Sequence, residues 1–489
     1  EQEKIKREIL DLARRIQGAC RVPPLLTADL EGGAGQVFGG ATRFPRPMGL
    51  AATGDESIVA EVARMTAAEA RAIGVHVCFQ PVVDVNVNPR NPIINVRSFG
   101  EDPAEVARLG AITIRALQAH GVIATAKHFP GHGDTEIDSH LALPVVRASR
   151  ARLDRVELPP FVAAVESGVG AVMSAHIAWP EVSAEPGLPA TLDRSVLHGI
   201  LREEMGFEGI IFTDALTMGG ITEHCSPEEA AMRALLAGAD ALLHVDVETL
   251  LPELARGARA GRIPAALVER SAGRILAAKE SLGLHQAARG ERPTPAGPIA
   301  TREAATIAGE AVRRSITLIR DRRGEIPMRA PGRRRLLQVL VVDPGQDSWG
   351  FTPGERLATT LRERGATVET VPIDAGGDGL ADALGRGREV DAVVVTAYSG
   401  VAAFRGSSGL SPRQLEALGT LGRAGAILIA MGNPYALSGL GDFSAVLLAY
   451  DTCERTDRLA AGALLGDFTP TGTLPVTIPG LADRGAGRR

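Results

Sequence analysis

The sequence predicts an α/β protein of two domains, an N-terminal TIM barrel of the (β/α)8 type followed by a C-terminal three-layer α/β/α sandwich. Three observations predict this organisation: short apolar runs alternate with helical patterns, a polar and proline-rich stretch follows, and longer apolar runs occupy the rest of the 489 residues. We expect the barrel at residues 1–284, the linker at 285–304 and the sandwich at 305–489.

In the first half, six apolar runs end in an ionisable side chain. The residues at these ends are Asp29, Asp84, Lys127 with His128, His176, Asp214 and Asp246. In a parallel β/α barrel the active site lies at the carboxyl ends of the strands, so side chains gathered there indicate chemistry rather than packing. A doubly wound sheet is the rival topology, but it needs a phosphate-binding loop near the first strand, and the sequence shows none there.

Between these runs, residues 55–74 and 101–121 predict helices that cover the barrel, because both stretches start with acidic residues, are rich in Ala and end in Gly. Beyond the linker, four continuous apolar runs predict strands that are buried on both faces, as in a parallel sheet with helices on either side. These runs lie within residues 334–343, 390–398, 425–434 and 443–451.

The composition excludes several classes of function. A net charge of -5 and a pI near 6.1 provide no basic field for a nucleic-acid backbone, so we expect no nucleic-acid partner. The apolar runs are far shorter than the roughly 20 residues that a membrane helix needs, so we expect no membrane span. The four cysteines contain no CxxC pair, which indicates neither a disulfide framework nor a zinc knuckle.

The start of the chain bears on its location. Residues 1–17 form a charged amphipathic pattern, unlike the basic and then apolar pattern of a secretory signal, which favours the cytoplasm. Because the chain begins with Glu rather than Met, removal of a preceding segment remains an alternative.

The segment KHFPGHGDTEIDSH, at residues 127–140, carries three His, two Asp, one Glu and one Lys in fourteen positions. So many ionisable groups in a loop favour a functional site over a solvated turn. Within it, Asp138 and His140 have the spacing at which a carboxylate orients an imidazole while the other ring nitrogen faces a reacting group. The alternative is a hydrogen bond that only fixes the turn. His132 has the plainer interpretation of bracing the loop.

Asp214 ends a buried strand, where an unpaired carboxylate is costly to desolvate. We interpret it as a nucleophile or a ligand-binding acid, and the alternative is an N-cap for the next helix. Asp29 is followed by Gly32 and Gly33, which allow a ligand to approach the backbone. Lys127, His128 and Arg97 add hydrogen-bond donors suited to sugar hydroxyls or a carbonyl.

A metal site is an alternative to this interpretation, because His128, His132 and His140 with nearby Asp could supply nitrogen and oxygen ligands. Their spacing fits no recurrent zinc motif, so we predict no metal. The candidate chemistry also requires no cofactor.

Several motifs together resemble glycoside hydrolase family 3, and within it the β-N-acetylhexosaminidase branch in its two-domain form. They are DLEGG at 29–33, PVVDVN at 81–86, RSFGEDP at 97–103, the loop at 127–140, FTDALTM at 212–218, MGNPYAL at 431–437 and TGTLPVTIP at 471–479. The resemblance implies a retaining mechanism on N-acetylglucosaminides from bacterial cell wall or chitin.

The resemblance also implies roles for individual residues. Asp214 would be the nucleophile, His140 the general acid/base and Asp138 the group that orients it. Residues implied or expected to bind the substrate are Asp29, Arg97, Lys127, His128 and His176.

One position departs from the family pattern. Val37 stands where many relatives have a sugar-binding Arg, which leaves the recognition of hydroxyl groups, and hence the sugar preference, open. Arg43 is a candidate substitute.

Two further activities remain alternatives in the same site. Retaining hydrolysis normally uses two carboxyl groups, but here a histidine, a residue type that can both donate and accept a proton, takes the place of the second. Because an imidazole does not repel phosphate as a carboxylate does, phosphorolysis is the first alternative, with phosphate as a second substrate. A β-glucosidase of the same family is another, and a sugar-binding protein without activity is disfavoured because both reacting groups are present.

In the second domain, residues 399–409 form a Gly/Ser-rich stretch with Arg405. In parts of the family this domain lends a loop to the active site, so the stretch is a candidate for contact with substrate or a partner. A plain connection is the alternative.

Overall fold

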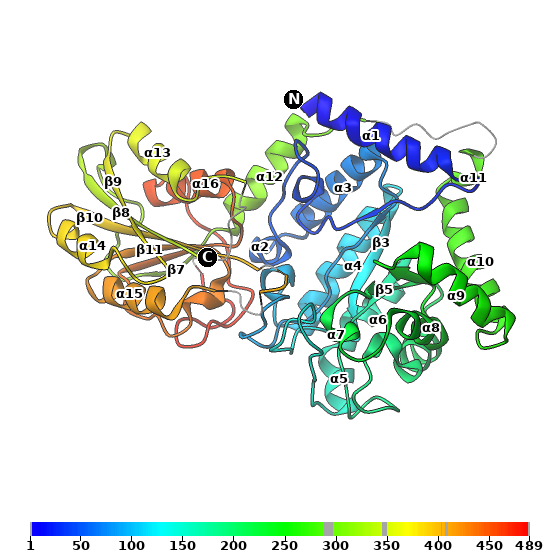
Figure 1. The fold of residues 1–489 in the computed structure, drawn as a ribbon. Helices are drawn as coiled ribbons and strands as arrows, with labels where there is room; N and C mark the ends of the chain where they lie inside the picture. Colours follow the sequence, from blue (N-terminus) through cyan, green and yellow to red (C-terminus); the bar gives the residue numbers. More distant parts are fainter. Residues whose placement is uncertain (1, 288–296, 345–349, 402, 406–408, 488–489) are drawn as a thin grey trace. The chain divides into compact units, whose positions relative to one another are not determined.

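The computed structural model describes residues 2–287, 297–344, 350–401, 403–405 and 409–487. The chain forms two compact units, each made of several chain segments (Figure 1). The first contains residues 1–44, 59–88 and 102–305, and the second contains 45–58, 89–101 and 306–489. Residues 288–296 of the predicted linker lie outside the described part.

The first unit is built on a sheet of six parallel strands in sequential order, which confirms the α/β class with a barrel-type N-terminal half. Six strands are found in the described residues, so closure into an eight-stranded barrel stays a prediction. The strands are β1 Thr27–Ala28, β2 Val77–Cys78, β3 Ile123–Phe129, β4 Ala171–Ser174, β5 Ile210–Ala215 and β6 Ala241–Leu243.

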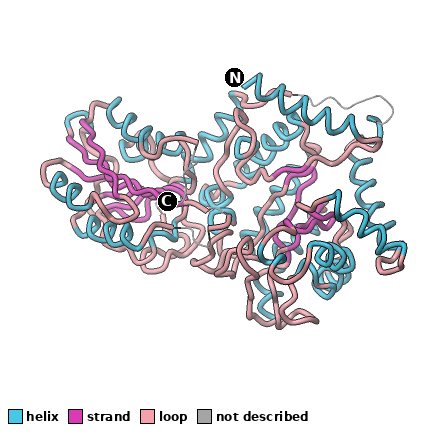
Figure 2. Tube along the Cα trace, in the orientation of Figure 1, coloured by secondary structure: helices cyan, strands magenta, loops and turns pink. Residues whose placement is uncertain are grey.

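Helices between these strands surround the sheet, and α4 and α6 both pack on β3 (Figure 2). The helices are α1 Gln2–Ala19, α3 Glu56–Ile73, α4 Pro103–Ala119, α5 Arg150–Val156, α6 Leu158–Glu166, α7 Gly219–Thr222, α8 Pro227–Ala237, α9 Val247–Arg259, α10 Ala265–Ser281 and α11 Leu284–Ala287, with a π-helix, η4, at Ser195–Glu204. None of the helices in the described ranges has the length and apolar content needed to cross a membrane.

The two helices expected in the first half form close to their predicted bounds. Asp102 caps α4 by accepting from the backbone N–H groups of Ala104 and Glu105, and Pro103 occupies its first turn. Gly121 follows the helix with φ +76°, a conformation that glycine adopts without strain. The sequence signals therefore correspond to the physical start and stop of the helix.

The second unit is a three-layer sandwich, as predicted. Its sheet has the order β7-β12-β11-β10-β8-β9. The strands are β7 Thr317–Asp321, β8 Arg335–Val342, β9 Thr367–Ile373, β10 Ala392–Ser399, β11 Ile427–Gly432 and β12 Ala445–Ala449. The helices are α2 Pro47–Ala52, α13 Glu355–Glu363, α14 Leu380–Gly387, α15 Pro412–Arg423 and α16 Glu454–Leu465, and α12 Arg302–Ser315 continues into this unit from the first.

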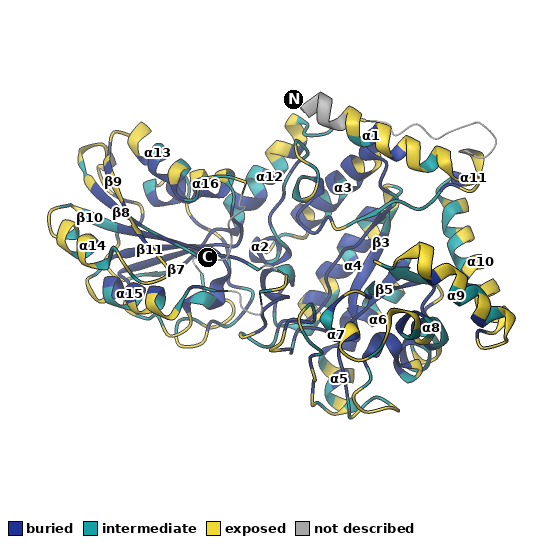
Figure 3. Cartoon of the chain, in the orientation of Figure 1, coloured by how far each residue is buried: buried dark blue, intermediate teal, exposed yellow. Residues whose placement is uncertain are grey.

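Both faces of this sheet are buried. On β11, Leu428 belongs to the apolar cluster under α14 and α15, while its neighbours Ile427 and Ile429 belong to the cluster under α13 and α16. Figure 3 shows the inner strands of this sheet largely in the buried colour and the outer faces of the helices exposed, whereas the edge strand β9 has exposed residues. The sheet is mixed rather than wholly parallel, because the edge strand β7 runs antiparallel to β12.

Candidate functional site

Lys127, at the end of β3, is the buried cation of the site. Its ammonium group lies 2.5 Å from Asp29 Oδ1 and 2.9 Å from Glu31 Oε1. The Lys127 side chain is 2% exposed, so it requires these two partners, whereas the Asp29 side chain is 55% exposed. Asp29 therefore keeps a carboxylate that can accept hydrogen bonds from a ligand.

Asp84, after β2, organises the start of the loop that follows β3. Its carboxylate lies 2.7 Å from His128 Nδ1 and accepts the backbone N–H of His132 at 2.6 Å. Burial favours the neutral acid, but His128 and His132 outweigh it, so that the pKa of Asp84 is lowered. The charged carboxylate thus fixes the position of both histidines.

His132 has both ring nitrogens engaged within the loop. Nδ1 lies 2.8 Å from Thr135 Oγ1, and Nε2 lies 2.9 Å from Ser139 Oγ. This matches the interpretation of His132 as a brace, since the contacts join the two halves of the loop.

Asp138 and His140 form the predicted pair. His140 Nδ1 lies 2.7 Å from Asp138 Oδ1, and the same oxygen accepts the His140 backbone N–H at 3.0 Å. The Asp138 side chain is fully buried, whereas the His140 side chain is 21% exposed. A carboxylate beside Nδ1 favours the tautomer with its proton on that nitrogen and fixes the orientation of the ring.

Asp214 lies at the carboxyl end of β5 and is half-buried. It does not cap the next helix, since the N-cap of α7 is Met218, and its Oδ1 instead accepts the N–H of Ala215 at 2.7 Å. Burial alone would raise the pKa of Asp214, but His128, His176, the Ala215 N–H and Lys127 lower it to about 2. The carboxylate is therefore ionised at neutral pH.

His176 lies fully buried after β4 and supports this strand end. Nδ1 lies 2.8 Å from Thr191 Oγ1, and Nε2 lies 2.9 Å from the carbonyl oxygen of Ala215. Burial lowers the pKa of His176 even though Asp214 opposes the shift. With both nitrogens engaged by protein atoms, His176 fits the positioning of Asp214, and its predicted contact with substrate stays a prediction.

The loop that carries His140 is attached to the segment that follows Asp214. The N–H of Gly219 donates to the His140 carbonyl oxygen at 3.0 Å, and that of Gly220 donates to the Ser139 carbonyl oxygen at 3.0 Å. His140 and Asp214 also both act electrostatically on His176. An imidazole and an ionised carboxylate are thus held at one end of the sheet.

Arg97 and Asp246, two other ionisable residues singled out in the sequence, make contacts with residues other than those described above. Arg97 belongs to the second unit, where its guanidinium donates to the Ile93 carbonyl oxygen at 3.0 Å, and its contact with a sugar stays a prediction. Asp246 caps α9 by accepting the Glu248 N–H, so this strand end serves the helix. Within the described ranges, no three or more His, Cys, Asp or Glu are grouped so as to hold a metal ion.

Val37, the position that departs from the family pattern, lies in a segment where the chain reverses its direction. Gly35 N donates to the Thr42 carbonyl oxygen at 2.8 Å, and Phe44 N donates to the Gly32 carbonyl oxygen at 2.8 Å. The segment with Arg43 therefore runs beside the glycines that follow Asp29, while Val37 is 52% exposed.

Residues 399–409 are described in part, because 402 and 406–408 lie outside the described residues. Arg405 forms an ion pair with the buried Asp343, with Nη2 2.6 Å from Oδ1. This contact fastens the stretch to the end of β8, and a role in substrate or partner contact stays a prediction.

Sequence reasoning gave no specific role to Asp84, Glu31 or the Gly219–Gly220 pair. Asp84 could have been found, since it ends an apolar run in the same way as Asp214. Glu31 is adjacent to Asp29 in sequence, but its contact with Lys127 depends on how β1 and β3 lie in the sheet. The attachment of Gly219 to the loop has no signal in the sequence.

Comparison with known proteins identifies the family. Residues 1–278 match the glycosyl hydrolase family 3 N-terminal domain. A β-N-acetylglucosaminidase/β-glucosidase of Cellulomonas fimi is 35% identical over 381 residues, which cover 75% of this chain and 67% of that protein. The chain therefore belongs to glycosyl hydrolase family 3 and is a glycoside hydrolase.

Solved structures share the whole architecture. A family 3 β-N-acetylglucosaminidase from Paenibacillus sp. superposes with a TM-score of 0.85 at 33% identity, covering 98% of this chain and 91% of that one. A β-glucoside phosphorylase superposes with a TM-score of 0.85 at 28% identity, covering 96% of this chain and 87% of that one. The resemblance inferred from the sequence is confirmed at the level of the family.

Gly219→Ala should displace the loop that carries His140. A Cβ atom at Gly219 would lie 2.2 Å from the Leu141 carbonyl oxygen, so the backbones must separate. We expect a loss of activity of about tenfold or more, because a misplacement of about 1 Å can cost about 100-fold. Gly273→Ala on α10, where a Cβ would meet nothing within 4 Å, is the matched control. Equal kcat/KM for both variants and the parent chain would contradict this attachment.

Proposed function

We propose that this protein is a retaining, exo-acting β-N-acetylglucosaminidase that removes terminal N-acetylglucosamine from cell-wall or chitin-derived saccharides. The observation that carries the proposal is the Asp138–His140 pair, which is hydrogen-bonded through its loop to the segment following Asp214. A proton-exchanging imidazole and a carboxylate with a pKa of about 2 are the two groups that a double displacement requires.

In the first step, Asp214 attacks the anomeric carbon and the bond to the leaving oxygen breaks. His140 donates its Nε2 proton to that oxygen, and a covalent glycosyl-Asp214 ester forms. Asp138 stabilises the imidazolium before transfer and keeps the ring aimed afterwards.

In the second step, neutral His140 accepts a proton from water as the water oxygen attacks the anomeric carbon. The ester bond breaks, Asp214 leaves as a carboxylate, and two inversions give net retention. The low pKa of Asp214 suits it to leave, since the charge that it regains is stabilised by His128, His176 and Lys127.

The sugar assignment is supported by the Cellulomonas fimi and Paenibacillus relatives, whose names include N-acetylglucosaminidase activity. Asp29 provides an acceptor for sugar hydroxyls, Lys127 fixes its carboxylate, and Asp84 fixes the ring of His128, the second expected contact, through Nδ1. Arg43 is the candidate for the contact that Val37 cannot make. A β-glucosidase remains an alternative, because the name of the Cellulomonas fimi relative includes that activity as well.

Phosphorolysis is the second candidate activity. It is supported by the similarity to a β-glucoside phosphorylase and by the presence of an imidazole, rather than a second carboxylate, as acid/base. Phosphate would then attack the glycosyl-Asp214 ester in place of water and yield a sugar 1-phosphate.

Replacing the nucleophile tests the double displacement. Asp214→Ala should reduce kcat by at least about 10³-fold, because no glycosyl ester can form. Azide should restore turnover of a nitrophenyl glycoside and give the α-glycosyl azide through a single inversion. Asp154→Ala, at an exposed ion pair with Arg150, is the control and should keep parental rates. A β-azide product, or no effect of the Asp214 substitution, would contradict the assignment.

The acid/base role of His140 predicts a dependence on the leaving group. His140→Ala should slow cleavage of a natural disaccharide much more than that of a nitrophenyl glycoside, because a good leaving group needs little protonation. Asp138→Asn should show the same selectivity to a smaller degree. Equal losses on both substrates would show that His140 is not the proton donor.

The identity of the sugar product shows whether water or phosphate is the acceptor. We expect nitrophenyl N-acetyl-β-glucosaminide to release free N-acetylglucosamine at the same rate with and without phosphate, and the first product detected by NMR should be the β-anomer. A sugar 1-phosphate formed at a higher rate in phosphate would establish a phosphorylase. Release from the plain glucoside alone would contradict the N-acetyl assignment.

A further inference from the structure

A cationic cavity lies in the first unit, away from the carboxyl ends of the strands. Its volume is about 120 Å³, which exceeds the roughly 10–15 Å³ that one water requires. The residues that line it are Arg194, His198, Arg202, Phe207, Glu208, Gly238, Leu267, Arg270, Ser271 and Arg274. They come from η4, α10 and the turns that precede β5 and β6. The cavity is therefore at the amino ends of the strands.

Part of this positive charge has a structural role. Arg202 donates to Asp240 Oδ2 at 2.6 Å and to the carbonyl oxygens of Phe207 and Gly209, both at 2.7 Å. Arg274 donates to Asp240 Oδ1 at 3.0 Å. The single buried carboxylate of Asp240 thus pairs with two guanidinium groups, so one of their two positive charges has no negative charge to balance it.

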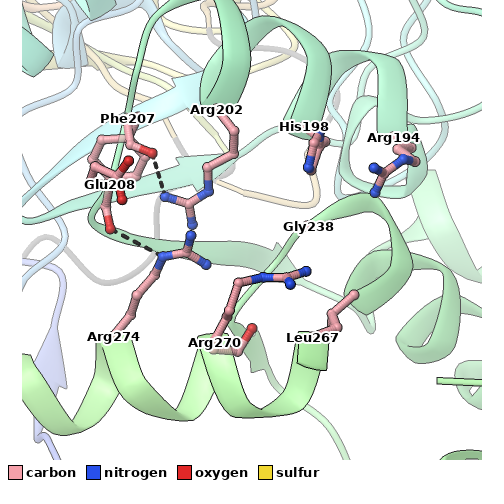
Figure 4. A pocket seen from close by; sticks show the side chains of 10 residues that line it. Arg194, His198, Arg202, Phe207, Glu208, Gly238, Leu267, Arg270 and Arg274 are labelled. Carbon is pink, nitrogen blue, oxygen red and sulfur yellow. Dashed lines mark hydrogen bonds between the residues drawn. The ribbon is translucent and has the colours of Figure 1, made fainter. Parts of the chain in front are cut away.

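The other two arginines have no carboxylate partner. Arg270 makes neither a hydrogen bond nor an ion pair with any residue in the described part of the chain, and Arg194 donates only to the Leu236 carbonyl oxygen at 3.4 Å. Figure 4 shows Arg270 beside Arg202 and Arg274, with Arg194 and His198 farther along the same cavity. Four guanidinium groups therefore line a space in which Glu208 is the one lining carboxylate.

The surroundings of His198 support this excess of positive charge. Burial, Arg194, Arg270 and Arg202 lower the pKa of His198, and the opposing effect of Glu203 does not compensate. Burial and the neighbouring Arg274 also lower the pKa of Arg202 to about 10, against the effect of Asp240. An anion in the cavity would relieve this repulsion.

We propose that this cavity binds the phosphoryl group of a small molecule, either free phosphate or a phosphomonoester. Guanidinium groups form paired hydrogen bonds with phosphate oxygens, and a dianion matches the two guanidinium charges that have no carboxylate partner. Arg202 and Arg274 are held in place by Asp240 at the base, while the exposed Arg194 and Arg270 can close on the ligand from the rim. Ser271, which is 9% exposed, adds a hydroxyl to the lining.

Isothermal titration calorimetry of the full chain with inorganic phosphate, at constant ionic strength set by chloride, tests the proposal. We expect saturable binding, a rise in Tm with phosphate, and a loss of affinity of tenfold or more in Arg270→Gln and Arg194→Gln. Arg259→Gln, an exposed arginine on α9 outside the cavity, is the matched control and should bind like the parent chain. The variants should keep the parental Tm without phosphate, since Arg270 and Arg194 are exposed and have no carboxylate partner in the described part of the chain.

Glucose 6-phosphate and glucose form two further arms. Tighter binding of the ester than of phosphate identifies a phosphomonoester site, and the reverse identifies a phosphate site; glucose should not compete. Absence of phosphate binding to the parent chain would overturn the proposal. So would binding that Arg270→Gln and Arg194→Gln leave unchanged, because the phosphate would then bind elsewhere, as in the catalytic site of a phosphorylase.

Discussion

The site depends on a buried carboxylate, Asp84, which holds the loop after β3 in one conformation. A charge without exposure to solvent is stable only when several donors converge on it, and here His128 and the N–H of His132 do so. Removing the charge would release both histidines. The order of the loop thus follows in part from an electrostatic requirement.

A second constraint links the loop to β5. Contacts from Gly219 and Gly220 reach the backbone of residues 139–140, and this close approach needs residues without a side chain. Asp214, His176 and the loop consequently share one framework, in which His176 supports the strand end through Ala215. Small movements of this framework would change the distance between His140 and Asp214, the acid/base and nucleophile that we propose, and a displacement reaction is highly sensitive to that distance.

The sequence predicts much of this arrangement for a specific reason. Apolar runs that end in charged residues show where parallel strands end, and the Asp138–His140 spacing is short enough to specify a contact by itself. The four continuous runs of the second unit correspond to β8, β10, β11 and β12. The edge strands β7 and β9 do not appear as continuous apolar runs, because β7 ends in Arg320 and Asp321 and β9 places exposed residues among its buried ones.

Contacts between segments that are far apart in the chain could not be predicted from the sequence. The pairing of Lys127 with Glu31 and of His176 with Thr191 depends on sheet order and on loops with no periodic signal. The arginine cavity was missed for the same reason, since Arg194, Arg202 and Arg270 come from two separate helical segments and appear unremarkable in an acidic chain. The net charge of a chain gives no indication of charge clusters that form only when the chain folds.

The two ends of β5 differ in charge in a way that allows each to bind its own ligand. Asp214 is at the carboxyl end, whereas Arg202 donates to the backbone just before the amino end. At about 3.3 Å per residue the strand separates them by roughly 17–20 Å. At an effective dielectric constant of about 20, a dianion at that distance changes the energy of Asp214 by about 2 kcal/mol before salt screening, and physiological salt screens most of this because the distance is about two Debye lengths. An uncharged glycoside bears no charge that responds to this field, so an anion at the amino end and a sugar at the carboxyl end can bind largely independently.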